Sequence, residues 1–226
     1  MAKSIYLVGG SKGGVGKSTV TMGLLDYLSY HGESVVLIET DTTNPDVAKA
    51  YKGTLPIELI NLDEADGWIQ LVNIFDSAPE SAFVINTAAR NNQGVTAYGE
   101  TLNSTLADLQ RTLITLWVVN RQRDSLELLK EYTDAMPNAR VHVVRNSYFG
   151  DEKKFELYNG SRTRKLVEDA GGKSLTFPEL ADRVMDDLYT RRMSIAHALK
   201  ELPLGNRAEL TRWRNEVKKL FDQVAG

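Results

Sequence analysis

One short stretch near the start of the chain limits the folds open to it more than any other feature. Residues 11–19 read Ser-Lys-Gly-Gly-Val-Gly-Lys-Ser-Thr. Glycines at three of four successive positions allow backbone N–H groups to turn inward, because residues without a Cβ adopt the required dihedral angles without steric cost. A concave set of N–H groups binds anions. The stretch therefore predicts a phosphate-binding loop.

The flanking segments place this loop between a strand and a helix. Residues 4–8 are apolar and β-prone, and apolar residues then recur at helical spacing from Val20 to Leu28, before Gly32. Phosphate bound in such a loop meets the positive end of the helix dipole. We expect the Lys17 ammonium group to reach the β- and γ-phosphates, the Ser18 hydroxyl to bind magnesium, and Thr19 to contact the α-phosphate.

The loop departs from the ordinary phosphate-loop pattern, which has glycine where this chain has Ser11. It fits the variant Lys-Gly-Gly-x-Gly-Lys-Ser, with an additional lysine, Lys12, at its start. In this it resembles the deviant Walker A motif of the ParA/MinD family of P-loop ATPases. The resemblance implies that Lys12 reaches the partner's phosphates in a nucleotide-sandwiched homodimer, with ATP and Mg²⁺ as cofactors. The nucleotide-binding residues that it implies here are Gly13, Gly14, Val15, Gly16, Lys17, Ser18 and Thr19.

Alternating strand and helix patterns predict the rest of the fold. We expect strands at 4–8, 34–39, 56–62, 81–86, 113–119, 141–145 and 174–177. We expect helices after the loop, after Pro45, at 63–75, 95–110, 125–135 and 161–170, and after Pro178, Ser194 and Asn206. This order indicates a three-layer, doubly wound α/β fold with a mostly parallel sheet flanked by helices. With 226 residues and no linker-like stretch, residues 1–226 are expected to form a single P-loop nucleotide-binding domain.

Ligands of such sheets bind at the carboxyl ends of the strands. The loops that begin at Gly9, Thr40, Thr87, Asn120 and Asn146 are therefore expected to gather around the nucleotide.

Two of these strand ends carry the residues that hydrolysis would need. In the ParA/MinD family the second strand ends in Asp-x-Asp, and the second acid helps to position magnesium and the attacking water. Asp41 matches that acid, and Glu39 replaces the first. The resemblance implies a catalytic set of Lys12, Lys17 and Asp41.

The fourth strand resembles the family's hydrophobic run that ends in Asp-Thr-Pro, but Asn86 stands in place of the aspartate. An amide oxygen accepts a hydrogen bond from a magnesium-bound water but brings no negative charge. We expect Ser18 and Asp41 at the metal, with Asn86 and Glu39 acting through water. Two alternatives stay open: Glu39 supplies the missing charge, or the chain is a slow switch that binds ATP and barely hydrolyses it.

Two later segments resemble the family's base-binding elements. Residues 143–146 resemble the strand that ends in the asparagine contacting adenine, and residues 177–179 resemble the loop beside the base. The resemblance implies that Asn146 reads the base and that Pro178 lies next to it. The sequences of 41–46, 86–92 and 121–129 most resemble those of small plasmid-encoded ATPases of stabilisation, partition and mobilisation (conjugal transfer) systems.

Composition excludes several classes of function. The chain has no cysteine, which removes disulfides, thiolate catalysis and the Cys-ligated clusters used by some relatives. His31, His142 and His197 do not fall at zinc-ligand spacing. The sequence shows neither the apolar core of a signal peptide nor an apolar run long enough to span a membrane, so we expect a cytoplasmic protein.

The partners left open are DNA, a plasmid-encoded protein and a membrane. The basic residues that could contact a DNA backbone are Arg162, Arg164, Lys165, Arg191, Arg192, Arg207, Arg212, Arg214, Lys218 and Lys219. Acidic residues lie between them, so an ordinary solvated face is the alternative. The last helix is amphipathic, with its apolar side from Leu210 to Val224. Such a helix more often docks on its own core than on a membrane.

The favoured interpretation is a nucleotide-dependent, dimerising ATP switch with slow hydrolysis, in plasmid partition or conjugal mobilisation. The alternatives are a metabolic P-loop enzyme of the dethiobiotin-synthetase or cobyrinate-amidase type and a nonhydrolytic nucleotide-binding module.

Overall fold

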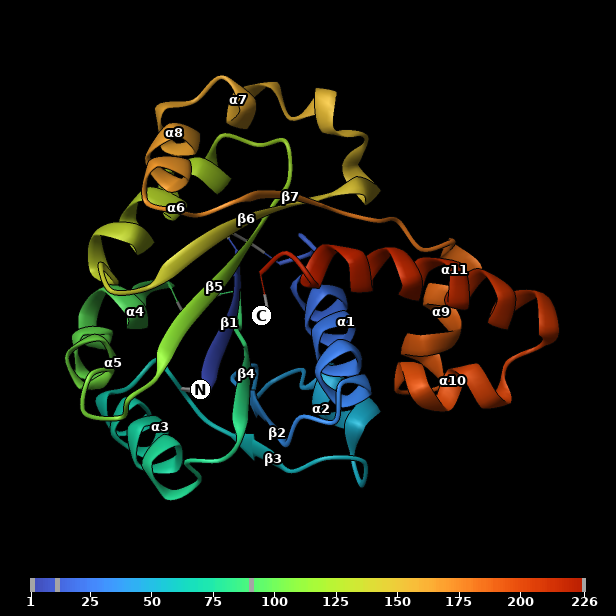
Figure 1. Cartoon of the computed structure of the whole chain (residues 1–226), viewed down its shortest axis with the longest axis horizontal. Helices are drawn as coiled ribbons and strands as arrows, with labels where there is room; N and C mark the ends of the chain where they lie inside the picture. Colours follow the sequence, from blue (N-terminus) through green and yellow to red (C-terminus); the bar gives the residue numbers. More distant parts are fainter. Residues whose placement is uncertain (1–2, 11–12, 90–91, 225–226) are drawn as a thin grey trace.

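The computed structural model describes residues 3–10, 13–89 and 92–224. Within them, seven strands form one sheet in the order β3-β2-β4-β1-β5-β6-β7, and every neighbouring pair is parallel (Figure 1). The strands are β1 Ser4–Gly10, β2 Val35–Glu39, β3 Ile57–Leu59, β4 Ala82–Asn86, β5 Thr112–Val119, β6 Arg140–Asn146 and β7 Ser174–Phe177. The chain builds one side of β1 and then the other, so the end of β1 lies at the point where strand order reverses.

Helices cover both faces of the sheet, which gives the predicted three layers (Figure 1). One face carries α1 Lys17–Tyr30, α2 Asp46–Tyr51, α9 Asp182–Thr190, α10 Ile195–Glu201 and α11 Leu204–Phe221. The other face carries α3 Ala65–Ser77, α4 Asn92–Tyr98, α5 Glu100–Thr105, α6 Asp124–Ala135, α7 Glu156–Asn159 and α8 Arg162–Asp169. Two 3₁₀ turns, Ser147–Phe149 and Glu152–Lys154, follow β6.

The predicted helix at 95–110 is wrong as a single element. It is divided at Gly99 into α4 and α5, and the chain turns again before β5. A Cβ at Gly99 would lie 2.5 Å from the backbone carbonyl oxygen of Val95 and 2.8 Å from Sδ of Met136, so the backbone here leaves no room for a side chain at residue 99. Two helix starts also differ from prediction: α3 follows Glu64 rather than Asp63, and α11 follows Pro203 rather than Asn206.

The last helix docks on its own domain, as the favoured interpretation predicts. Its apolar side is buried, and α11 contacts α1, α9, α10 and β7. The Arg214 guanidinium also donates to both carboxylate oxygens of Asp26 on α1, at 2.6 and 2.9 Å. The apolar side is thus covered by protein. Across the described part of the chain, no helix combines the length and apolar character needed to cross a bilayer.

Candidate functional site

The loop between β1 and α1 has the backbone geometry that its glycines predict. Gly14 and Gly16 adopt φ values of +78° and +101°, in the left-handed region that disfavours side chains. The first helical residue is Lys17. Lys12, the predicted cross-dimer lysine, lies outside the described residues.

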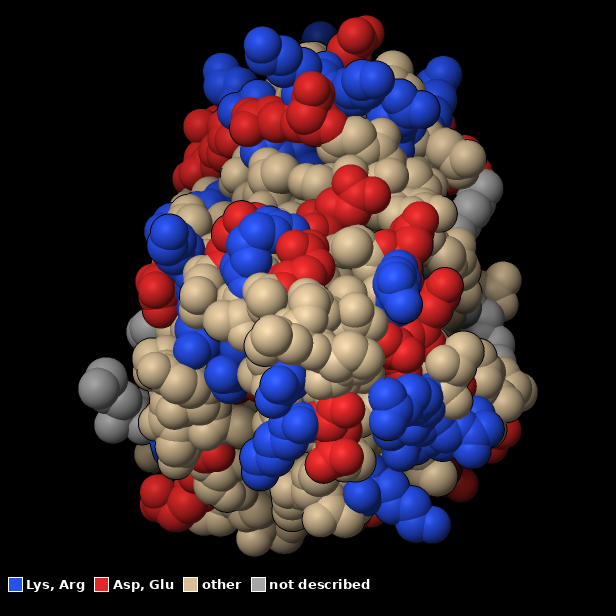
Figure 2. All heavy atoms as spheres, turned by 90° about the vertical axis from the view of Figure 1, so that its right-hand side faces the viewer, with Lys and Arg blue, Asp and Glu red and all other residues tan. Residues whose placement is uncertain are grey.

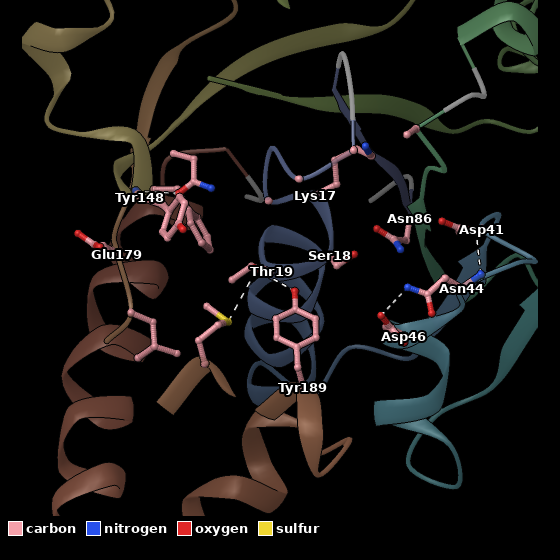
Figure 3. Close-up of a pocket in the computed structure, with 18 of the residues that line it drawn as sticks. Lys17, Ser18, Thr19, Asp41, Asn44, Asp46, Asn86, Tyr148, Glu179 and Tyr189 are labelled. Carbon is pink, nitrogen blue, oxygen red and sulfur yellow. Dashed lines mark hydrogen bonds between the residues drawn. The ribbon is translucent and has the colours of Figure 1, made fainter. Parts of the chain in front are cut away.

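A cavity of about 520 Å³ opens at this loop. Most of the predicted site residues line it. They are Gly13, Gly14, Gly16, Lys17, Ser18, Thr19, Asp41, Asn86, Asn146 and Pro178. Asp41 and Asn86 lie at one end of the cavity, Tyr148 and Glu179 at the other, and Lys17 and Thr19 between them (Figure 3). A ligand that spans the cavity would therefore contact Asp41 and Asn86 at one end and Tyr148 and Glu179 at the other.

Three predicted positions lie elsewhere. Val15 and Glu39 are buried and do not line the cavity. The loop at Asn120 lines a second cavity instead, together with Phe149 and Leu157. The turns that follow β6 form the other wall of that second cavity.

Among the described residues that line the cavity, Lys17 is the cationic one, and it lies in the central part. Burial lowers the pKa of its ammonium group to about 8, while the nearby Asp41 carboxylate acts in the opposite direction. A partly desolvated ammonium group gains more from an anionic ligand than an exposed one does, since the local dielectric constant is lower. The environment of Lys17 therefore favours phosphate.

Asp41 fixes the loop that follows β2. Its Oδ1 accepts hydrogen bonds from the backbone N–H of Thr43 at 3.2 Å, the Thr43 hydroxyl at 2.7 Å and the backbone N–H of Asn44 at 3.0 Å. This Asx turn holds the carboxylate at the cavity wall (Figure 3).

Asn86 connects a buried acid to α1. Its Nδ2 lies 2.9 and 3.1 Å from the two carboxylate oxygens of Glu39, to which it donates, and its Oδ1 accepts from the Thr21 hydroxyl at 2.9 Å. Glu39 is fully buried, and burial raises its pKa to about 7, although the hydrogen bond from Asn86 opposes this rise. A carboxylate in place of Asn86 would repel that of Glu39, whereas the amide donates to it.

The oxygen atoms at this end of the cavity fit magnesium held jointly with a nucleotide. The Ser18 hydroxyl, the Asp41 carboxylate and the Asn86 amide all belong to residues that line it. Magnesium prefers oxygen ligands and in such sites binds one or two carboxylates, waters and substrate phosphates. No cluster of three or more His, Cys, Asp or Glu residues suited to a metal occurs among the described residues. Waters and the phosphates of a nucleotide would supply the other ligands.

Asn146 ties the end of β6 to the phosphate loop. Its Nδ2 donates to the carbonyl oxygen of Val15 at 2.9 Å, and its Oδ1 accepts from the backbone N–H of Tyr148 at 3.1 Å. Beyond it, the Pro178 carbonyl accepts from Nε1 of Trp213 on α11 at 2.9 Å. Both residues line the cavity, next to an exposed aromatic ring, that of Tyr148.

Two cavity residues on α9 escape prediction from the sequence. Tyr189 and Met185 both approach the Thr19 hydroxyl (Figure 3). Neither belongs to a recognisable motif, and more than 150 residues separate them from Thr19. The only sequence signal is the amphipathic pattern of α9, which predicts packing rather than ligand contact.

Many of the basic residues considered for DNA contact are paired with acids or rings. Arg164 pairs with Glu168, Arg212 pairs with Glu209 and Glu216, and Lys218 lies over the ring of Tyr30. On the face that carries the last helices, basic and acidic side chains are interspersed (Figure 2). This distribution agrees with the solvated-face alternative for that surface.

Comparison with known families agrees with this geometry. A family model described as the CobQ/CobB/MinD/ParA nucleotide binding domain matches residues 6–147, which run from β1 to the turn after β6. The chain belongs to this family.

The chain is also similar to individual proteins. The chain is 74% identical over 224 residues to "Protein MobD" of Acidithiobacillus ferrooxidans, with 99% of each chain covered. It shares its fold with the cell division ATPase MinD of Pyrococcus furiosus, at 17% identity and a TM-score of 0.55, covering 97% of this chain and 100% of that one. The MinD cell division protein of Aquifex aeolicus is similar at 15% identity and a TM-score of 0.53, with 94% and 96% covered.

Proposed function

We propose that this chain is an ATP-binding switch that dimerises with nucleotide bound, hydrolyses ATP slowly, and acts in plasmid mobilisation. The observation that carries the proposal is the cavity in which a left-handed glycine loop, the start of α1 and the buried Lys17 converge. The nucleotide-binding family supports the ligand class. The name of its 74% identical relative, MobD, fits the mobilisation systems among the ATPases that the sequence resembles.

Different residues along the cavity would bind the phosphates, the base and magnesium. Lys17 and the N-terminus of α1 would neutralise the β- and γ-phosphates, and Thr19 would contact the α-phosphate. Asn146 and Pro178 would place the base at the far end of the cavity. Ser18 and Asp41 would hold magnesium, which when bound neutralises charge on the phosphates. Asn86 would accept a hydrogen bond from a metal-bound water.

The Asn86 side chain supports the proposal of slow hydrolysis. Phosphoryl transfer relies on positioned groups and on electrostatic stabilisation of the phosphoryl oxygens. Asn86 lines the cavity without a charge, and the acid behind it, Glu39, is fully buried. Two carboxylates were expected at the metal, those of Asp41 and Glu39. We therefore propose that only the Asp41 carboxylate faces the phosphates, and that the smaller negative charge at the metal limits turnover.

A nucleotide-binding assay tests the central claim. Titration of the purified chain with a fluorescent ATP analogue and magnesium should show saturable binding, and Lys17→Ala should weaken it about 10–100-fold, because charge-assisted hydrogen bonds are lost. Lys130→Ala is the control, since Lys130 pairs with Asp134 on the exposed side of α6. Equal affinity of wild type and Lys17→Ala, or no affinity of the wild type for any purine triphosphate, would refute the proposal.

Asn86 also favours a second candidate, a module that binds nucleotide without hydrolysing it. A turnover assay separates the two. Measurable phosphate release that Asp41→Ala abolishes supports the switch, whereas binding without release supports the module.

A further inference from the structure

One contact at the cavity joins the start of α1 to the C-terminal part of the chain. The phenolic oxygen of Tyr189 on α9 lies 3.0 Å from Oγ1 of Thr19, and Sδ of Met185 lies 3.9 Å from the same oxygen. Both α9 residues line the cavity, and the Tyr189 ring points toward Thr19 from below it (Figure 3). The family model matches residues 6–147, so Thr19 lies inside the matched range and the two α9 residues lie outside it.

Helix α9 packs against the core, and Tyr189 is half-buried at the cavity. Val184 and Leu188 of α9 are buried in the core. The Asn206 side chain on α11 donates to Oδ2 of Asp187 at 2.7 Å. Burial also raises the pKa of the Tyr189 phenol, which keeps its proton in place at neutral pH.

The direction of the hydrogen bond follows from proton counting. Either oxygen can donate in the contact between Tyr189 and Thr19. A threonine hydroxyl has one proton and two lone pairs, whereas an ionised phosphate oxygen only accepts. If Thr19 donates its proton to a phosphate, Tyr189 must be the donor in their contact. A hydroxyl that accepts one hydrogen bond also donates more strongly, since hydrogen bonds in a chain polarise one another.

We propose that Tyr189 is a positioning residue for the nucleotide: its O–H donates to Thr19 Oγ1 and thereby directs the Thr19 proton to the α-phosphate. This inference rests on the proposed nucleotide-binding function. It adds to it a residue from α9 that acts through Thr19 and not by direct contact with the phosphate.

The first test compares affinities for ADP without a divalent cation. Tyr189→Phe removes one oxygen atom, and we expect it to weaken ADP binding about three- to tenfold, the effect of one hydrogen bond. Thr19→Val should weaken binding at least as much, and Tyr189→Phe should add nothing in the Thr19→Val background. The matched control is Tyr158→Phe, because the Tyr158 hydroxyl makes a comparable 2.7 Å contact with Ser174 Oγ away from the cavity.

A second readout separates positioning from general stabilisation. In ADP with sulfur in place of one nonbridging α-oxygen, the two diastereomers present different atoms to Thr19. Wild type should prefer one diastereomer, and both Tyr189→Phe and Thr19→Val should reduce that preference, which a loss of stability alone would not change. Tyr189→Met, which also removes the hydroxyl, replaces Tyr189→Phe if the latter does not fold.

The outcomes distinguish the two proposals. A wild type that binds neither ADP nor the ATP analogue with magnesium contradicts the proposed function, whereas one that binds the ATP analogue but not ADP contradicts only the contact of Thr19 with the α-phosphate. A wild type that binds ADP, with affinity and diastereomer preference unchanged in Tyr189→Phe, overturns the role of Tyr189 alone. Additive losses in the double variant also overturn it, since the two hydroxyl groups would then act independently.

Discussion

The amide of Asn86 has hydrogen-bond partners on both sides, which makes it a structural link as well as a candidate ligand of a metal-bound water. It donates to Glu39 on β2 and accepts from Thr21 on α1. The same Thr21 oxygen lies 2.9 Å from the carbonyl oxygen of Lys17. The three side chains thus connect two strand ends to the first turns of the helix that carries the phosphate loop.

We predict that Asn86→Asp destabilises the protein instead of restoring an ordinary metal site. Two carboxylates would face each other across the 2.9 Å that now separates Nδ2 of Asn86 from Oε1 of Glu39. Like charges so close force one group to bind a proton, and we expect a loss of about 2 kcal/mol in the free energy of unfolding. Denaturant unfolding at pH 7.5 measures it.

The control for this prediction exchanges the two groups. The double variant Glu39→Gln/Asn86→Asp again pairs one amide with one carboxylate, so it should recover most of the lost stability. If Asn86→Asp is as stable as the wild type, the repulsion argument is wrong.

At the residue scale, the sequence predicts the groups that belong to the loop and to strand ends, because spacing alone places them. Lys17, Thr19 and Asp41 are examples, and all line the cavity. Sequence could not place Tyr189, since its contact depends on how α9 packs on α1. It also could not show that Glu39 lies behind Asn86, because both simply end buried strands.

At the scale of elements, the inner strands β1, β2, β4 and β5 are the easiest to predict, because each contains a continuous apolar run. The strand expected at 56–62 forms only over Ile57–Leu59, at the edge of the sheet. Helix limits were harder. At the break, the Gly99 backbone comes close to the Val95 carbonyl oxygen and to the Met136 side chain, and the sequence does not record the contact with Met136. The turns and short helix of 147–159 have no clear apolar period and were not predicted.

The strand β6 carries a titratable group that should limit stability in acid. His142 is buried, its Nδ1 accepts from the backbone N–H of Lys173, and burial lowers its pKa to about 4. A histidine whose pKa is depressed in the folded state contributes stability above about pH 6.5, and this is lost as pH falls toward 4. Allowing for solvent screening, the loss is on the order of 2 kcal/mol.

We therefore predict that His142→Gln flattens the dependence of stability on pH between about 6.5 and 4, the interval between the ordinary and the folded pKa. The glutamine oxygen can still accept from the Lys173 N–H. Thermal unfolding across this interval gives the comparison, with the exposed His197→Gln as control. An acid-side slope in His142→Gln as steep as that of the wild type would contradict the prediction.

At the scale of the whole molecule, the order of strands explains why the site lies where it does. The chain lays β2 to β4 on one side of β1 and β5 to β7 on the other. The alternation of strands and helices predicts such a layout as a class. It did not predict that the loop after β5 would face a separate cavity, since that depends on the turns after β6.

Dimerisation is the whole-molecule property on which the proposed switch depends. We predict that the wild type forms dimers with a nonhydrolysable ATP analogue and magnesium. Lys12→Ala should abolish these dimers while leaving nucleotide affinity largely intact, because the family resemblance assigns Lys12 to the partner's phosphates. Light scattering measures the mass, and dimers that persist in Lys12→Ala would contradict the assignment.

The Nδ2 atom of Asn146 lies only 2.2 Å from where a Cβ of residue 16 would be, while the same atom donates to the neighbouring Val15 carbonyl. A side chain at residue 16 would therefore meet the Asn146 side chain, which comes from a distant part of the sequence. A short synthetic peptide with the glycine-rich segment would lack this brace from β6. Affinity for phosphate would then be a collective property of the folded sheet edge, not one that such a peptide carries by itself.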